Sequence, residues 1–304
     1  MHLHSSSIIQ PTAARRKFGG YKREEPKVIR KADVAVRKDP VIEQLKRVWK
    51  AHPLESINIL LLGSSYHEEV SASIRSQHYS AKDVEHFSLL LFEFDHEKNF
   101  SEKAGIFLTA LVENGREEDF VIHTSTLGQL VNHLGKGNTK NILVKGDVGS
   151  HTATEMKKGK ITIEGDEHGY AGLRMEGGLI EILGNAGEVI GWDMRNGMII
   201  VHGNAEYNTG NEMGGGEIIV YGDVGFFTGR GMKGGRLRVK GNAGDFTGED
   251  MEGGIIWIEK DSGPCILGRK MTGGEIHVGG ECIVWPDYVK GGRIFRKGVL
   301  IVDK

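Results

Sequence analysis

The segment GDVGFFTGRGMKGGRLRVKG, residues 222–241, decides the fold. It ends in a short strand pattern, GRLRVKG, in which apolar and basic residues alternate between two glycines. Alternation of period two buries one face of a strand and leaves Arg236, Arg238 and Lys240 in water. The next stretch, GNAGDFTGEDMEGG at 241–254, begins the same pattern again nineteen positions later. A unit of that length holds one short strand and its turns, but not two strands and a helix.

Methionine marks the register of this repeat. Seven of the nine methionines follow one another at a constant spacing of nineteen positions, with a single spacing of twenty, namely Met156, Met175, Met194, Met213, Met232, Met251 and Met271. Aliphatic residues follow each methionine by five and seven positions, and small residues form a further column, namely Val148, Ala186, Ala205, Val224 and Ala243. Of the 45 glycines, 37 lie after residue 140, and only six residues of the chain are proline. Glycine corners and strands without proline are typical of a parallel ladder.

The repeat therefore predicts a β-solenoid over residues 141–304, a right-handed parallel β-helix of about seven or eight rungs in which every turn stacks on the last. Residues 298–302 predict a short closing strand at its C-terminal end. A small α/β domain at 41–140 is expected to cap the other end, because a bare solenoid end exposes apolar surface and unpaired edges. Within this cap the patterns predict helices at 41–51, 68–76, 82–94, 101–114 and 127–134, strands at 57–63 and 119–124, and a first rung at 141–145.

Composition narrows the classes of function. The 304 residues are 38% hydrophobic and 26% charged, with a formal net charge of −2, so the whole chain gives no reason to expect nucleic acid or an anionic membrane as partner. Two cysteines are too few for a disulfide framework. The longest apolar stretches are too short to span a bilayer. The opening MHLHSSS lacks the apolar core of a signal peptide. A cytoplasmic protein is expected. Residues 1–40 predict a flexible basic arm, with ten basic residues between Arg15 and Lys38, for an acidic partner surface or RNA.

Several groups of residues are candidates for chemistry. A column of aspartates and asparagines follows the strands, namely Asp147, Asp166, Asn185, Asn204, Asp223 and Asn242. It favours backbone capping at turns over calcium binding, because the nine-residue calcium repeat is absent. Cys265 and Cys282 fall at nearly equivalent places in successive rungs, but two thiols make a poor zinc site. The aromatic residues Tyr170, Tyr207, Phe226, Phe227 and Phe246 predict a packed or partner-facing ridge.

The sequence GSSYH at 63–67 follows a predicted strand and precedes a predicted helix, so Gly63–Ser65 could hold an anion through backbone N–H groups. Ser64 or Ser65 with His67 could form a nucleophile and base. A second hydrolase hypothesis uses Ser150, His151 and His123 between the cap and the first rungs. Neither candidate carries a recognised catalytic motif.

The M-x-G-G-x-I-x-V strand and the recurring G-x-x-G-x-x-x-G pattern of segments 222–241 and 241–254 resemble the GXGXG β-helix family. Its members include the C-terminal domain of the glutamate synthase large subunit and the β-helical subunit of formylmethanofuran dehydrogenase. The resemblance covers roughly residues 140–304 and implies a scaffold without catalytic, cofactor-binding or metal-binding residues of its own. It implies partners among amidotransferase, flavin, iron–sulfur, molybdenum or tungsten subunits of an oxidoreductase complex, or a homo-oligomer. The segment before residue 140 has no counterpart in that pattern.

The expected function is therefore a non-catalytic scaffold or assembly subunit. Two alternatives remain open at this point. One is a hydrolase with a site between the N-terminal domain and the first rungs, and the other is an anion-binding or small-molecule-binding protein.

Overall fold

The computed structural model describes residues 39–55, 65–263 and 266–304, which belong to one compact unit. Nearly all of the predicted basic arm, the predicted strand at 57–63 and Cys265 lie outside the described residues. No helix in the described ranges is long and apolar enough to cross a membrane.

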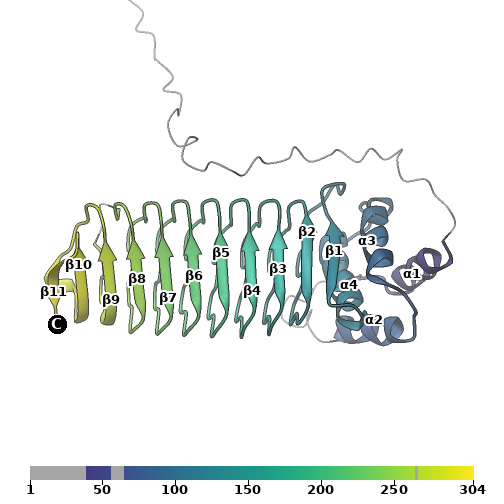
Figure 1. The fold of residues 1–304 in the computed structure, drawn as a ribbon, viewed down its shortest axis with the longest axis horizontal. Helices are drawn as coiled ribbons and strands as arrows, with labels where there is room; N and C mark the ends of the chain where they lie inside the picture. Colours follow the sequence, from purple (N-terminus) through teal and green to yellow (C-terminus); the bar gives the residue numbers. More distant parts are fainter. Residues whose placement is uncertain (1–38, 56–64, 264–265) are drawn as a thin grey trace, which may run out of the picture. The chain divides into compact units, whose positions relative to one another are not determined.

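A single sheet runs through this unit, and its strands follow one another in chain order (Figure 1). The strands are β1 (Asp119–His123), β2 (Asn141–Lys145), β3 (Lys160–Ile163), β4 (Leu179–Ile182), β5 (Met198–Val201), β6 (Glu217–Val220), β7 (Arg236–Val239), β8 (Ile255–Ile258), β9 (Thr272–Val278), β10 (Gly291–Arg296) and β11 (Val299–Asp303). Neighbours from β1 to β10 are parallel, with equivalent residues opposite one another apart from a shift between Gly291 and Arg293 of β10, so that Ile218 lies opposite Ile199 and Leu237. The predicted parallel β-solenoid is confirmed.

The ladder begins earlier than the repeat predicts. Strand β1 pairs with β2, with Asp119 opposite Asn141, although the two residues are 22 positions apart. The described residues thus form ten parallel strands, slightly more than the predicted seven or eight rungs. The predicted helix at 127–134 is wrong. His133 N donates to Ser150 O at 2.9 Å, and Leu134 O accepts from Ala153 N. Because these groups bond to the next turn, they cannot close helical hydrogen bonds.

The core of the solenoid is built from stacked columns. The seven methionines of the repeat are completely buried, and the second and fourth residues of the four-residue strands point inward beside them. Gly229 shows why a corner before each methionine requires glycine. Its φ is +67°, a left-handed conformation, and a Cβ there would clash with Ile256 Cδ1 of β8. Both backbone conformation and close packing therefore exclude a side chain.

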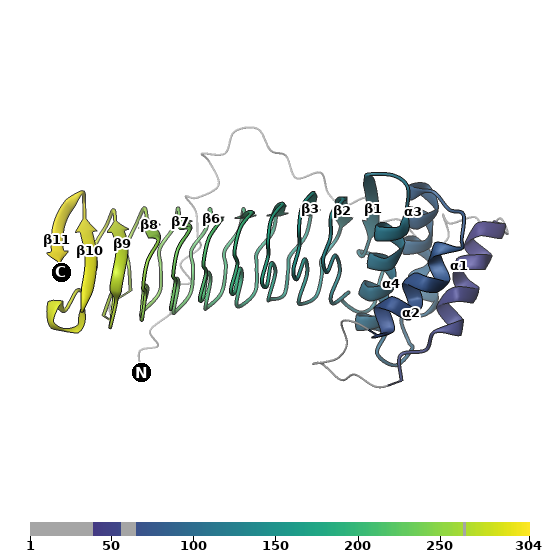
Figure 2. The same cartoon turned by 90° about the horizontal axis from the view of Figure 1, so that it is seen from below.

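Helices close the β1 end of the ladder (Figure 2). They are α1 (Pro40–Ala51), α2 (Ser65–Arg75), α3 (Ala81–Leu90), the 3₁₀ turn η3 (Leu91–Glu93) and α4 (Phe100–Asn114), so four predicted helices are confirmed. Helix α4 lies directly on the first turn, since a Cβ on Gly105 would overlap the backbone oxygen of Asn132. The described part of the predicted α/β cap is helical, because its one described strand, β1, belongs to the solenoid sheet.

The C-terminal end closes as the sequence predicts. Strand β11 turns back and pairs antiparallel with β10, with Val302 opposite Ile294. The short 3₁₀ turn η4 (Pro286–Tyr288) lies in the connection between β9 and β10. The longer spacing between Met251 and Met271 leaves the ladder intact, since Ile255 pairs with Glu275 in the same register as the other strands.

Candidate functional site

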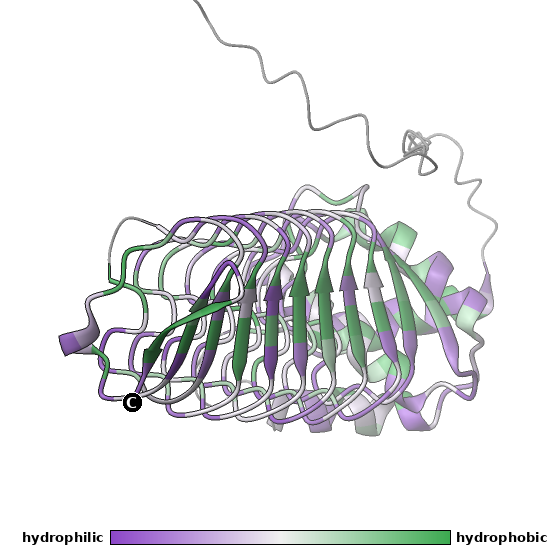
Figure 3. Ribbon diagram, turned by 60° about the vertical axis from the view of Figure 1, so that its left-hand side comes forward, coloured by the Kyte–Doolittle hydropathy of each residue, from purple (hydrophilic) through white to green (hydrophobic). Residues whose placement is uncertain are grey.

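The outer face of the sheet extends over all ten parallel strands of the ladder. The first and third residues of the strands point away from the core and stay partly or largely exposed. We call the third-position residues the outer column, which comprises Val121, Leu143, Thr162, Glu181, Ile200, Ile219, Arg238, Trp257, His277 and Phe295. Apolar residues run along many of these strands (Figure 3). Parallel sheets normally have both faces covered, and here the core covers only the inner one.

The middle of this face is apolar. Ile200 and Ile219 are neighbours in the outer column, and Leu179 and Met198 lie beside them in the first-position column. Glu181 borders this centre and accepts hydrogen bonds from Lys160 Nζ at 2.7 Å and His202 Nε2 at 3.1 Å. The hydrogen bond from Lys160, followed by that from His202, outweighs partial burial and lowers the pKa of Glu181. The carboxylate is therefore ionised at neutral pH.

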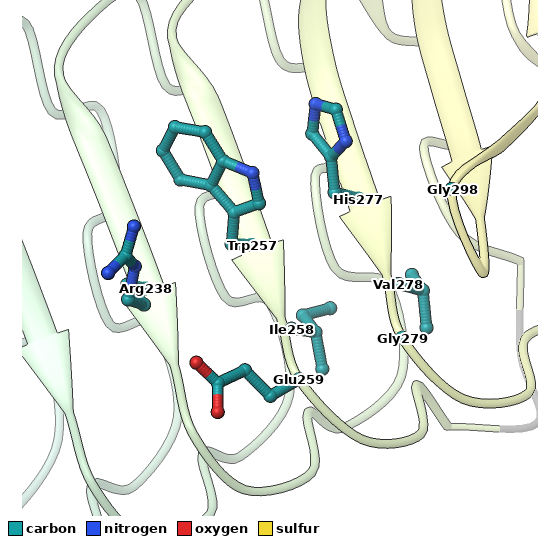
Figure 4. Close-up of a pocket in the computed structure, with 8 residues that line it drawn as sticks. All are labelled: Arg238, Trp257, Ile258, Glu259, His277, Val278, Gly279 and Gly298. Atoms are coloured by element: carbon teal, nitrogen blue, oxygen red, sulfur yellow. The ribbon is translucent and has the colours of Figure 1, made fainter.

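Towards the C-terminal end the outer column becomes aromatic. The His277 ring stacks on Phe295 at 4.4 Å and on Trp257 at 5.6 Å between ring centroids, and the Arg238 guanidinium lies 5.5 Å from the Trp257 ring. Figure 4 shows Arg238, Trp257 and His277 on successive strands above an open pocket of about 400 Å³ that also contacts Glu259. Because neighbouring side chains cover one another's ring faces, mainly ring edges remain for a ligand. Such a surface suits protein contact better than stacking of a planar molecule.

A second open hollow of about 560 Å³ lies at the start of β5 to β8. It is lined by Gly197, Met198, Gly215, Gly216, Glu217, Gly235, Arg236 and Ile255. Both hollows thus lie on the same sheet, one at each end of the strands.

The three residues of the hydrolase hypothesis do not share one site. Ser150 Oγ lies 3.2 Å from His151 Nδ1, so these chain neighbours are in contact. His123 is on β1, where its ring is held by Glu85 of α3 at 3.0 Å. The His151 ring instead lies between His133 and Tyr170, at 4.9 and 4.7 Å. Among the described residues, no carboxylate bonds to His151 to orient this side chain as a base.

Burial controls the charge of this histidine pair. Desolvation lowers the pKa of His151, and desolvation together with the neighbouring His151 lowers the pKa of His133 to about 4. Both imidazoles are therefore neutral at pH 7. A neutral stacked ladder at a solenoid corner is a structural arrangement, and it gives the hydrolase hypothesis no support.

The remaining candidates also have structural roles or fall outside the described residues. Gly63 and Ser64 are not described, whereas Ser65 begins α2 and His67 Nε2 lies 3.0 Å from Glu113 Oε2 of α4. Cys282 is partly buried, and this burial raises the pKa of its thiol. The described ranges contain no group of three or more His, Cys, Asp or Glu side chains arranged to hold a metal ion.

The aspartate and asparagine column forms a hydrogen-bonded ladder. Asp147 Oδ1 accepts from Asp166 N at 2.8 Å, and Asp166 Oδ1 accepts from Asn185 N at 2.7 Å. The same bond recurs along the column as far as the N–H of Glu281. These side chains cap the backbone of the next turn rather than their own. The structural interpretation therefore accounts for them, because each Oδ1 already has a donor.

The aromatic ridge divides into two parts. Phe227 and Phe246 stack at 5.3 Å, and Tyr170 stacks on His151, so these rings are packed. Phe226 is 55% exposed and Tyr207 is 43% exposed, so these two side chains face solvent. The ridge is thus both packed and partner-accessible.

Sequence reasoning missed Glu167, which occupies the small-residue column between Val148 and Ala186. The side chain is buried, and Oε2 accepts from Gly169 N at 2.9 Å. Oε1 has no hydrogen-bond partner within the described residues. Burial is the dominant cause that raises the pKa of this carboxyl to about 8. The sequence signal that could have revealed this residue is the replacement of a small side chain by glutamate at one repeat of the column.

Comparison with known proteins adds no identification. The chain matches no protein-family model, and no curated protein matches its sequence.

Proposed function

We propose that the protein is a non-catalytic scaffold subunit that binds a protein partner through the outer face of its sheet. The observation that carries this proposal is the apolar centre on β4 to β6, bordered by charged and aromatic side chains. An apolar core within a polar rim is the usual anatomy of a protein interface. Trp257 and Arg238 belong to the residue types that most often dominate binding energy.

The rigidity of the face supports this role. Parallel hydrogen bonds between successive turns fix the backbone of every outward-facing residue. A preformed surface loses little conformational entropy on binding. Several candidate catalytic side chains, by contrast, are engaged by structural partners, as His123 is by Glu85. The site therefore fits recognition better than chemistry.

The family resemblance bears on the kind of complex. As this resemblance implies, the proposed partners are subunits of an oxidoreductase similar to glutamate synthase or formylmethanofuran dehydrogenase. Those subunits would supply the amidotransferase, flavin, iron–sulfur, molybdenum or tungsten chemistry. The proposed role of this chain is to hold them in a fixed arrangement, with no cofactor of its own.

Native mass spectrometry of the protein isolated from its source at natural abundance tests this proposal. We expect a complex with other subunits that is lost on Ile219→Arg and on Ile200→Glu. The fold should tolerate both changes, because Arg238 and Glu181 occupy the neighbouring positions of the same column.

Lys233→Glu provides the matched control. Lys233 is exposed at a corner away from the outer column, and Glu252 occupies the equivalent position of the next turn. The control variant should keep its partners. A protein without other subunits, or a complex that survives both changes on the outer face, would contradict the proposal.

A further inference from the structure

The residues of the outer column are complementary to the same residues taken in the reverse order, with apolar side chains opposite apolar ones and an acidic side chain opposite a basic one. Along β4 to β7 the column runs Glu181, Ile200, Ile219, Arg238. The middle of the ten parallel strands lies between β5 and β6, which is also the middle of this pattern. A second copy, related by a two-fold axis parallel to the strands at that point, places β5 over β6 and β4 over β7. Ile200 then meets Ile219, and Glu181 meets Arg238, twice in each dimer.

The same rotation matches residues further from the centre. It brings Thr162 over Trp257 and Val121 over Phe295 in the outer column. In the first-position column it brings Asp119 over Arg293, which is also paired with Glu275 of its own chain. The other first-position residues of the central strands are not matched in this way, since Met198 lies over Glu217 and Leu179 over Arg236. The complementarity is therefore concentrated in the outer column.

The alternative two-fold arrangement is disfavoured by charge. Rotation about the long axis of the solenoid keeps each strand over its own copy and reverses its direction. Arg238 would then face Arg236, both from β7, twice in each dimer. Like charges at such a contact discriminate against that orientation.

Arg238 is available for an intermolecular pair. Its guanidinium lies over the Trp257 ring, and no carboxylate of the described residues forms an ion pair with it. Arginine presents a planar set of donors that fits a carboxylate with two hydrogen bonds. Glu181 has its carboxylate at the matching height of the face, and Arg238 of the second copy would share this carboxylate with Lys160 and His202.

The area of the face is sufficient for a stable dimer. Ten strands at a spacing of about 4.8 Å span about 43 Å, and the four residues of a typical strand of the ladder span about 13 Å, which gives about 560 Å² per copy. Two copies would bury about 1,100 Å², which exceeds the area of about 1,000 Å² expected of a specific interface.

We infer that the partner of the outer face is a second copy of this chain, antiparallel to the first, with Glu181 of each copy paired with Arg238 of the other. This inference rests on the proposed docking face and names its occupant. The contact is isologous, so that it closes at two copies. Other subunits of a complex would then bind across both copies of this dimer, so that a change on the outer face that separates the copies, such as Ile219→Arg, would also release those subunits.

Sedimentation equilibrium of the full-length protein tests the inference. We expect the unmodified chain to be dimeric. Glu181→Arg and Arg238→Glu should each weaken dimerisation on the order of 100-fold, because like charges would meet twice. An equimolar mixture of the two variants should restore the dimer, since one copy then carries two arginines and the other two glutamates. This rescue also shows that both variants are folded. Lys233→Glu should leave the dimer unchanged.

A protein that stays monomeric at its highest soluble concentration would overturn the inference. So would a dimer that both charge reversals leave intact, or a mixture in which the dimer does not return. If the chain is monomeric but Ile219→Arg still removes other subunits, only this inference fails. If it forms the predicted dimer and never carries other subunits, only the scaffold proposal fails.

Discussion

Glu167→Gln should make the stability of the protein less dependent on pH. The side chain is 2% exposed, and burial raises the pKa of its carboxyl from 4.5 to about 8. The native chain therefore keeps this proton up to about pH 8, whereas the unfolded chain releases it near its ordinary pKa. Between these two pH values the native state binds more protons than the unfolded state. The free energy of unfolding must then fall as pH rises through that window.

The size of the effect follows from the shift in pKa. Each unit between the two pKa values corresponds to about 1.4 kcal/mol. With a folded-state pKa of about 8, the buried carboxyl costs the native state about 3 kcal/mol at pH 7 and about 5 kcal/mol once the pH exceeds both values. Glutamine has a similar shape, can still accept from Gly169 N and does not titrate.

Urea unfolding followed by circular dichroism, from about pH 5 to about pH 9, measures this difference for the two proteins. The variant should gain stability over the natural chain progressively as the pH rises, while contributions of other groups cancel. Glu167→Ala is a useful second variant, because alanine fills the same column at Ala186. A difference in unfolding free energy that is constant with pH, or that shrinks as pH rises, would refute the reasoning.

Other consequences of the fold can be tested by similar measurements. Met213→Ala in the buried methionine column should reduce the unfolding free energy by about 2–5 kcal/mol in urea, and a smaller loss would show that the column is loosely packed. Gly229→Ala should destabilise more than Gly298→Ala, because both have positive φ but only Gly229 meets a neighbouring side chain; equal losses would leave only the backbone effect, about 1 kcal/mol. Calcium or a chelator should leave the melting temperature unchanged, since a backbone N–H group already occupies Oδ1 of each residue in the ladder from Asp147 to Asp261. A rise in melting temperature with calcium would contradict the capping role.

The solenoid could be predicted because every turn repeats the same physical environment. The methionine, glycine and aliphatic positions of the repeat each correspond to one column of stacked residues. A single alignment of the repeats therefore predicts most of the ladder. The segment 127–134 shows where this reasoning stops. Its apolar residues Leu127, Leu130, Val131 and Leu134 have helical spacing, yet its backbone bonds to residues 149–153 of the next turn. Local periodicity does not reveal a partner that is supplied by a distant part of the chain.

The candidate site was harder to predict for a related reason. The repeat identifies the inward residues, such as Ile218 and Val220, because they must be apolar in every turn. The outward residues vary, and the self-matching order of Glu181 and Arg238 has meaning only once the strands are known to lie in register. Chemical motifs were also misleading, since Ser150 and His151 are adjacent in sequence but His123 lies on β1 beside α3.

In-register stacking makes this protein a molecular ruler. Equivalent residues of successive turns are separated by one strand spacing, about 4.8 Å. An insertion of one whole repeat would lengthen the ladder by one strand spacing and leave the order of side chains on either side of the insertion unchanged. A single extra residue, as between Met251 and Met271, does not break the ladder, since Ile256 and Ile276 still pair. Evolution can therefore change the length of the recognition surface in whole steps without altering its spacing.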